Sequence, residues 1–306
     1  MRYSFIIPVY NRPEEVDELL NSLTRQTNKN FEVLIVEDGS SVPCKEVVDN
    51  YADRLDICYY FKSNSGPGQT RNYGAERGHG EYLIILDSDC ILPEGYLAAV
   101  ESELQRQKAD AFGGPDRAHD SFTNIQKAIN YAMTSFFTTG GIRGGKKKMD
   151  KFYPRSFNMG VRAEVYKALG GFSKMRFGED IDFSIRIFQG GYACRLFPEA
   201  WVWHKRRTDL KKFFKQVHNS GIARINLYKK YPESLKVVHL LPALFTIGIV
   251  FLLLCSLVCS WSLSLLLLFA LIICVDSTLR NKSFKIGLLS ILASFIQLIG
   301  YGTGSV

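Results

Sequence analysis

Short apolar runs alternate with helical patterns through the first third of the chain. Four runs rich in β-branched and aromatic residues predict buried strands at residues 5–9, 31–36, 57–61 and 82–86. The apolar positions between the first two runs recur at helical spacing and are Val16, Leu19, Leu20 and Leu23. Asn11 is the expected cap of this helix and Pro13 lies in its first turn. Strands and helices that alternate with short connections predict an α/β fold with a mostly parallel sheet covered by helices on both faces.

From residue 237 onward the chain is almost purely apolar. The three stretches, residues 237–258, 261–275 and 286–301, compare with the roughly 20 residues that a membrane-spanning helix needs. The second and third are short, so we expect them to span with flanking residues or to lie partly in the interface. A buried helical core is the alternative, but little in this tail is polar enough to face water. We therefore predict a soluble domain over residues 1–232 and a membrane domain with two to three transmembrane helices over residues 233–306.

Basic residues flank the first two apolar stretches only at their outer ends. They are Lys229, Lys230 and Lys236 before the first stretch, and Arg280, Lys282 and Lys285 after the second. The connection between the two stretches, Cys259-Ser260, carries no charge. Under the positive-inside rule this asymmetry predicts a hairpin with both basic ends in the cytoplasm.

The net charge indicates which partners to expect, and the cysteines indicate the compartment. The net charge is +8, but the clusters at residues 205–207, 211–212 and 229–230 approach the membrane segment, where anionic headgroups attract basic residues. No nucleic-acid motif accompanies them, so we expect a membrane and no nucleic acid as partner. The seven cysteines are scattered without a CxxC pair, which suggests neither a zinc site nor a disulfide framework and indicates reduced thiols facing a cytoplasm.

Polar residues gather where the predicted strands end. They are Asn11, Asp38, residues 65–68 and residues 87–89. Ligands of such sheets bind beyond the carboxyl ends of the strands, so these positions predict a single nucleotide-type site. Asp87 and Asp89 are separated by one residue, and two carboxylates so placed can hold one divalent cation that clamps two phosphates. A solvated acidic turn is the alternative.

Two further residues near this edge each allow a functional and a structural interpretation. Asp38 can accept an N–H from a nucleobase or a ribose hydroxyl, or it can form an Asx-turn before Gly39. Arg71 follows the Gly-rich residues 65–68 and can pair with a phosphate, or with Asp38 or Asp87.

Two later positions in the chain also allow both a functional and a structural interpretation. Glu179 and Asp180 begin an amphipathic helix, where acidic residues cap the helix and favour its dipole, or aim a carboxylate at an acceptor hydroxyl. His204 ends the aromatic run at residues 201–203 and is either structural or a metal ligand. The chain has no GxGxxG after the first strand and no GxxxxGK[ST], which disfavours a dinucleotide oxidoreductase and a P-loop NTPase.

A set of motifs occurs in a distinctive order along the chain. The motifs are Ile6-Ile7-Pro8-Val9-Tyr10-Asn11, Val36-Glu37-Asp38-Gly39-Ser40, Asn64-Ser65-Gly66-Pro67-Gly68, Arg71-Asn72, Leu86-Asp87-Ser88-Asp89, Ser156-Phe157-Asn158, Gly170-Gly171-Phe172, Gly178-Glu179-Asp180 and His204. Together they resemble the family 2 glycosyltransferases, which have the GT-A fold, over about residues 3–232. The ordered set is far more specific than any one motif.

The resemblance implies a nucleotide site made from the early motifs. Pro8 and Tyr10 would line the base pocket, and Asp38 would hydrogen-bond the base of a UDP- or GDP-sugar. Arg71 would lie beside the nucleotide. Asp87 would bind near the ribose or through metal-bound water.

The resemblance also implies a metal and a base. Asp89 would coordinate Mn²⁺ or Mg²⁺ on the diphosphate, and His204 resembles an additional ligand whose nitrogen favours Mn²⁺. Asp180 resembles the general base that deprotonates the acceptor, with Glu179 as its neighbour. Such glycosyltransferases invert the anomeric centre by direct displacement, without a covalent intermediate.

The chain departs from the family pattern in two places. The base-binding motif reads Glu37-Asp38 where Asp-Asp is frequent. Residues 216–220 read Gln-Val-His-Asn-Ser near where processive synthases carry QxxRW, and the missing Arg-Trp favours single-sugar transfer.

Lys146–Lys148 lie in a Gly-rich stretch and allow two interpretations. They would add positive charge from a loop that closes over the donor, or they would belong to a solvated surface loop. In the first case alanine replacement of the three lysines would raise the donor KM.

The apolar tail implies a lipid-linked acceptor. An undecaprenyl-diphosphate saccharide would place the catalytic domain at the cytoplasmic face of a bacterial inner membrane, in cell-surface polysaccharide synthesis. Transfer to a polyprenyl phosphate is the second possibility within the family. A non-catalytic scaffold of a polysaccharide export complex and a nucleotidyltransferase are alternatives from other classes.

Overall fold

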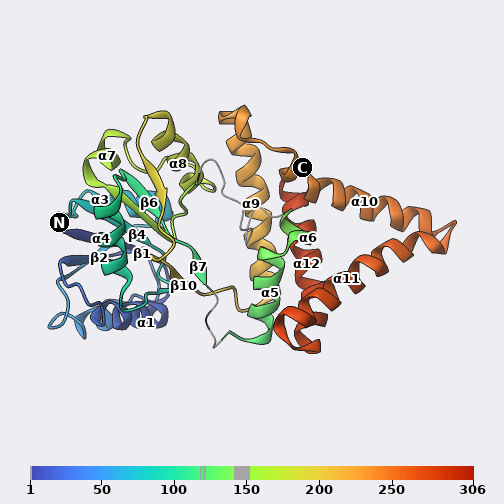
Figure 1. Ribbon diagram of the computed structural model, residues 1–306, viewed down its shortest axis with the longest axis horizontal. Helices are drawn as coiled ribbons and strands as arrows, with labels where there is room; N and C mark the ends of the chain where they lie inside the picture. Colours follow the sequence, from blue (N-terminus) through green and yellow to red (C-terminus); the bar gives the residue numbers. More distant parts are fainter. Residues whose placement is uncertain (1, 118, 120–121, 141–151) are drawn as a thin grey trace. The chain divides into compact units, whose positions relative to one another are not determined.

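The first compact unit of the protein is an α/β domain. The structure is a computed structural model that describes residues 2–117, 119, 122–140 and 152–306. The main sheet has the order β3-β2-β1-β4-β8-β6-β9 (Figure 1). Its strands are β1 (Tyr3–Val9), β2 (Phe31–Asp38), β3 (Ile57–Lys62), β4 (Tyr82–Leu86), β6 (Ala111–Gly113), β8 (Asn158–Arg162) and β9 (Cys194–Leu196). The first four pair in parallel and confirm the predicted strands, whereas β8 runs antiparallel to β4 and β6.

Helices cover both faces of this sheet, as the alternating pattern predicts. They are α1 (Pro13–Thr24), α2 (Lys45–Asp49), α3 (Pro67–Ala75), α4 (Tyr96–Arg106), α7 (Ala163–Ala168) and α8 (Glu179–Gln189). Successive side chains of β1 point to opposite faces, so Phe5 joins a core with Leu19 of α1 and Leu97 of α4. Ile6 joins the other core, with Phe183 of α8. The site residues therefore stand on a sheet that is buried on both sides.

The turn after β1 differs from the predicted helix cap. Arg12 occupies the N-cap position of α1 without a side-chain hydrogen bond, and Pro13 is the first helical residue. Asn11 has φ +54° and its Oδ1 accepts the backbone N–H of Val42 at 2.9 Å. The prediction of Asn11 as a cap was therefore wrong: its side chain instead ties the end of β1 to the loop that follows β2.

A small second sheet brings distant segments to the end of β4. It has the order β5-β10-β7, from β5 (Cys90–Ile91), β10 (Val202–His204) and β7 (Asp116–Arg117). β10 runs antiparallel to β5 and pairs His204 with Cys90. This pairing joins residues more than a hundred positions apart, so no local pattern indicates it.

The second compact unit is helical. Its helices are α5 (Asn124–Thr134), α6 (Phe136–Thr139), α9 (Leu210–Lys230), α10 (Leu241–Ser256), α11 (Ser264–Asn281) and α12 (Phe284–Gly304), with 3-10 turns η1 (Pro232–Ser234), η2 (Val237–His239) and η3 (Ser260–Leu263). α5 and α9 belong to this unit because their apolar faces share a core with α12. The division of the chain thus differs from the predicted boundary at residue 232, since α5 and α9, which both precede that residue, pack on the apolar tail.

Two helices of the tail are long and apolar enough to cross a membrane. They are Trp261–Asn281, which includes α11, and Phe284–Gly304, which is α12. In both, flanking residues lengthen the short apolar stretch into a helix of spanning length. The sequence allowed this arrangement or a position partly in the membrane interface. The first stretch, residues 237–258, instead forms the η2 turn and the shorter helix Leu241–Ser256, because Pro242 sits in the first turn of α10 and favours a helix start.

Candidate active site

The acidic residues predicted from the strand ends meet at the carboxyl edge of the main sheet. Asp87 follows β4 directly, and the turn through Asp89 leads into β5. Pairing of β5 with β10 places His204 opposite this turn. The His204 Nε2 atom lies 3.2 Å from Asp89 Oδ1 and 4.0 Å from Asp87 Oδ2. The structure therefore brings together the three residues predicted as metal ligands.

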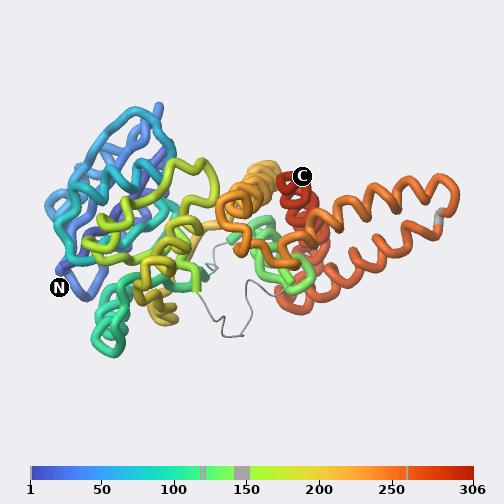
Figure 2. Tube along the Cα trace, turned by 90° about the horizontal axis from the view of Figure 1, so that it is seen from above, coloured from blue at the N-terminus to red at the C-terminus, as the bar shows by residue number. Residues whose placement is uncertain are grey.

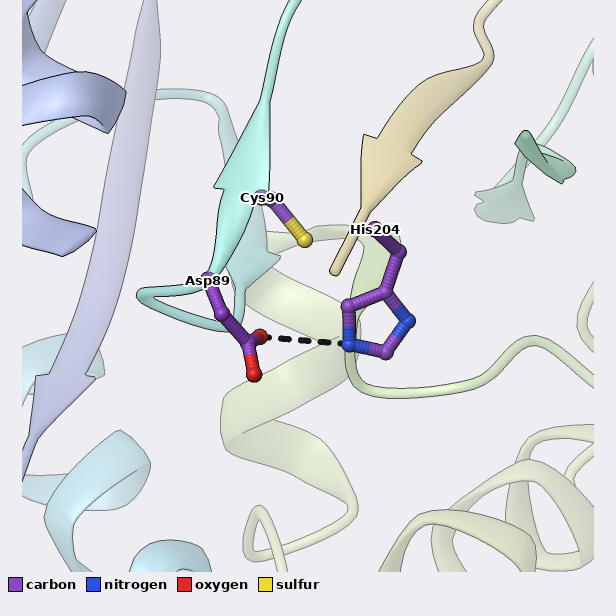
Figure 3. A group of neighbouring side chains, drawn as sticks. All are labelled: Asp89, Cys90 and His204. Carbon is purple, nitrogen blue, oxygen red and sulfur yellow. Dashed lines mark ion pairs between the residues drawn. The ribbon is translucent and has the colours of Figure 1, made fainter. Parts of the chain in front are cut away.

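Asp89, Cys90 and His204 form a group at this turn that could hold a metal ion. The ligand atoms of Asp89, Cys90 and His204 lie within 4.8 Å of one another (Figure 3). The His204 ring stacks on Phe157 at a centroid distance of 4.8 Å, which holds its orientation. Carboxylate oxygens with an imidazole nitrogen suit Mn²⁺, whereas a thiol suits softer metals. Burial raises the pKa of the Cys90 thiol, which donates to the Phe157 carbonyl oxygen, so Cys90 serves packing.

Arg71 links the end of β4 to the start of α8. Its Nη2 donates to Asp87 Oδ1 and its Nη1 donates to Glu179 Oε1, both at 2.9 Å, and its side chain is only 5% exposed. The guanidinium lies over the ring of Phe172 at 5.3 Å. The sequence allowed Arg71 to pair with a phosphate, with Asp38 or with Asp87. The structure shows the ion pair with Asp87. The pairing to Glu179 was not predicted.

Asp38 holds the Gly-rich loop rather than pairing with Arg71. Its Oδ1 accepts from Lys62 Nζ at 2.7 Å and from the Ser65 N–H at 2.9 Å. Its Oδ2 accepts from the Gly66 N–H at 3.0 Å, and Gly66 has φ +85°, a conformation that glycine adopts without strain. A carboxylate oxygen offers two acceptor positions, so Oδ2 retains capacity for one more donor beside these contacts.

Glu37 stabilises the loop that follows β2. Its side chain is fully buried and accepts from the Ser40 hydroxyl, the Cys44 N–H at 2.8 Å and the Tyr59 hydroxyl at 3.2 Å. The longer glutamate reaches across the loop, which gives the unusual Glu37-Asp38 pair a physical reason.

Replacement of Glu37 by glutamine is expected to lower the stability of the protein. The amide nitrogen would face buried donors, and leaving such groups unsatisfied costs about 1–3 kcal/mol. Thermal unfolding in detergent would measure the change, with exposed Glu46 replaced by glutamine as the matched control. Equal melting temperatures for the two variants would contradict the assignment.

Asp180 is buried at the start of α8 and is paired with the guanidinium of Arg155. Its Oδ2 accepts from Arg155 Nε at 2.6 Å and its Oδ1 accepts from the Ile181 N–H at 2.8 Å. Burial raises the pKa of Asp180, but the guanidinium of Arg155 outweighs it and the net pKa is lowered. Its neighbour Glu179 has a pKa raised by burial, against the charge of Arg71. The pKa values of the two adjacent carboxyl groups are thus shifted in opposite directions, and that of Asp180 is the one lowered.

Replacement of Arg155 by glutamine is expected to move the acid limb of the kcat/KM profile to higher pH. Asp180 must be ionised to accept a proton, and without the guanidinium its burial raises the pKa. Arg155→Lys keeps the charge and is expected to restore part of the shift. Rates of donor turnover between pH 5 and 9 would test this; an active Arg155→Gln variant with an unmoved acid limb would contradict it.

The remaining predicted residues lie at the end of β1. Pro8 is in β1 opposite Val36 of β2, and Tyr10 follows the strand with 54% of its surface exposed. Lys146–Lys148 lie outside the described residues.

Three residues at the site were missed by sequence reasoning. Arg12 donates to Asp89 Oδ2 at 2.5 Å, Lys62 binds Asp38, and Arg155 binds Asp180. Their only sequence signal is position: Arg12 follows Asn11, Lys62 ends the third strand and Arg155 precedes Ser156-Phe157-Asn158.

The fold and this acidic edge define a domain of the GT-A type. The chain belongs to the Glycosyl transferase family 2, whose family model matches residues 4–170. This confirms the family resemblance and the predicted fold class.

Curated relatives agree with this membership. Glycosyltransferase AglE of Haloferax volcanii is 27% identical over 259 residues, covering 77% of this chain and 79% of AglE. A glycosyltransferase of Haemophilus influenzae is 30% identical over 193 residues, 61% of this chain and 62% of the relative. The chain spans only 22% of the length of a Rickettsia felis glycosyltransferase that is 33% identical over 137 residues.

The structural comparisons bear on the fold alone. Mannosyltransferase PcManGT from Pyrobaculum calidifontis, in complex with GDP-Man and Mn²⁺, superposes with a TM-score of 0.65 at 18% identity, over 97% of this chain and 87% of that one. Residues 1–349 of Staphylococcus aureus TarS, in complex with UDP-GlcNAc, superpose with a TM-score of 0.53 at 19% identity, over 74% and 67%.

Proposed function

We propose that the protein transfers a single sugar from a UDP- or GDP-sugar to a lipid-linked saccharide in cell-surface polysaccharide synthesis. The observation that carries the proposal is the meeting of Asp87, Asp89 and His204 with Arg71 and the Glu179-Asp180 pair at one sheet edge. Family membership supports transfer of a sugar. The absent Arg-Trp after Gln216 supports one transfer per acceptor.

The donor would lie along the carboxyl edge. Asp38 retains an acceptor position for an N–H of the base, and exposed Tyr10 with Pro8 offers an aromatic and aliphatic surface for it. Arg71 would lie beside the nucleotide and holds Asp87, which would bind near the ribose, through its Nη2 hydrogen bond. Uracil and guanine both present an N–H, so this edge is compatible with either.

Asp89 and His204, with Asp87 beside them, would hold Mn²⁺ or Mg²⁺ on the diphosphate. When bound, the cation offsets the negative charge that develops on the leaving nucleoside diphosphate. Arg12 donates to Asp89 Oδ2, which adds positive charge beside the diphosphate and orients the carboxylate.

Asp180 would take the proton from the acceptor hydroxyl as that oxygen attacks the anomeric carbon. One base suffices for direct displacement, so the reaction inverts the anomeric centre. Arg155 would keep Asp180 ionised before the acceptor binds. Arg71 pairs with Glu179, so Glu179 would not act as the base. The basic flanks of the apolar tail support a catalytic unit at the cytoplasmic face of a bacterial inner membrane.

A donor screen tests the proposal. The detergent-solubilised protein would be offered a panel of nucleotide-sugars with and without Mn²⁺, beside Asp89→Ala and Asp180→Asn, with release of UDP and GDP measured. The expected result is metal-dependent release from one donor that both variants lose. Lipid-linked saccharides and polyprenyl phosphate, added separately, distinguish the acceptors. No release from any donor with any acceptor would favour the non-catalytic scaffold. Release of pyrophosphate instead of UDP or GDP would favour a nucleotidyltransferase.

A further inference from the structure

α12 is the central helix of the second unit, and other helices accompany most of its length. Ile286 and Ala293, in its first half, share a buried core with Ala128 and Ile129 of α5. Nearer its end the backbone of α12 touches α9 directly. A Cβ added at Gly304 would lie 2.0 Å from a backbone oxygen of α9, that of His218.

α9 cannot lie in the hydrocarbon of a membrane. Its basic residues are Lys211, Lys212, Lys215, Arg224, Lys229 and Lys230. A charge at the centre of a bilayer is costly, and the five lysines are exposed on the helix surface. Because α9 must stay at a polar surface, the part of α12 that packs on it must stay there too.

The outer face of α12 is apolar and is left exposed by the rest of the unit. Phe284, Leu288 and Leu292 are spaced four residues apart and exposed, which forms one apolar stripe. The α12 segment is 39% buried within the unit, against 17% for the segment of α11. The opposite side of α12 packs on α5 and α9, so α12 can rest in the headgroup region with the stripe toward the acyl chains.

α10 and α11 have the opposite character. They project together from the helices α5, α9 and α12 and join at a tip (Figure 1, Figure 2). Residues 240–275 contain no Asp, Glu, Lys or Arg, and Val258 and Trp261 at the tip are almost fully exposed. At 1.5 Å per residue the helices are about 24 and 27 Å long, close to the ~30 Å of a hydrocarbon core.

We infer that the protein enters the bilayer through the α10–α11 hairpin only, and that α12 lies in the plane of the headgroups on the side of the catalytic unit. Basic residues at the hairpin base match an anionic lipid surface; they are Lys236 before α10, Arg280 in the last turn of α11 and Lys285 in the first turn of α12. The chain passes from His204 to α9 in a few residues, which keeps α9, and with it α12, on the catalytic side. Both ends of α12 then face the same compartment, unlike those of a membrane-spanning helix.

Cysteine labelling at both ends of α12 tests this topology in the full-length protein. Sealed vesicles of anionic lipid carrying the protein, with the catalytic unit outward, would be treated with a membrane-impermeant maleimide, and labelled peptides mapped by mass spectrometry. The variants are Lys285→Cys and Val306→Cys, at exposed positions of the first turn and beyond the last. Exposed Cys58 of the catalytic unit marks the outer side, and exposed Cys259 marks the hairpin tip.

The expected result is labelling of both introduced cysteines to the extent of Cys58 without detergent, while Cys259 stays unlabelled. Protection of Val306→Cys until detergent is added, with Lys285→Cys labelled, would show that α12 spans the membrane and overturn the inference. Labelling of Cys259 from outside would overturn it too, because the hairpin would then not be inserted. Ser305→Cys repeats the measurement one residue earlier. No turnover is measured, so the outcome is independent of the proposed reaction.

Discussion

Replacing Asp180 by asparagine is expected to lower kcat by about 10²–10⁴-fold, the usual contribution of a positioned general base. Asparagine keeps the shape of the side chain and can still accept from the Ile181 N–H, but it cannot take a proton. Donor binding is expected to stay within a few-fold, because Asp180 lies at the acceptor side of the proposed reaction. Initial rates and calorimetric binding of the nucleoside diphosphate with Mn²⁺ would separate these two effects.

The control for Asp180→Asn is Glu76→Gln, a change of the same kind at an exposed position at the end of α3. It is expected to leave kcat and binding unchanged. If Asp180→Asn kept more than about a tenth of kcat while Glu76→Gln behaved as the unaltered protein, Asp180 would not be the base.

Replacing Asp89 or His204 by alanine is expected to weaken Mn²⁺ binding by at least about 10–100-fold, the loss that removal of outer contacts to metal ligands already produces. Asp89 supplies the more buried of the two carboxylates near His204, and the His204 imidazole lies 3.2 Å from it. Electron paramagnetic resonance of free Mn²⁺ would measure the affinity directly, without reference to turnover.

Cys90→Ser is the matched control for the metal site. Cys90 belongs to the same cluster as Asp89 and His204, but its thiol is a poor ligand for a hard cation. Its replacement is therefore expected to leave Mn²⁺ affinity unchanged. A loss with Cys90→Ser and none with His204→Ala would reverse the assignment of the ligands.

Much of the catalytic unit could be predicted because its early elements are local. The four parallel strands, helix α1 and the acidic turn at Asp87 each carry a pattern that neighbouring residues produce, and parallel strands align their carboxyl ends. The partners of the acidic residues could not be predicted. Arg12, Lys62 and Arg155 are ordinary cations in the sequence, and only folding places each beside one carboxylate.

The sequence by itself determined the family motifs, the positions of the first four strands and the apolar tail, because periodicity and composition act over short stretches. Only the tertiary structure decided that β10 returns to β5 with His204, that Arg71 joins Asp87 to Glu179, and that α5 and α9 pack on α12. These contacts join residues far apart in the chain. Their physical cause is the burial of complementary surfaces and the pairing of buried charges, which no local pattern encodes.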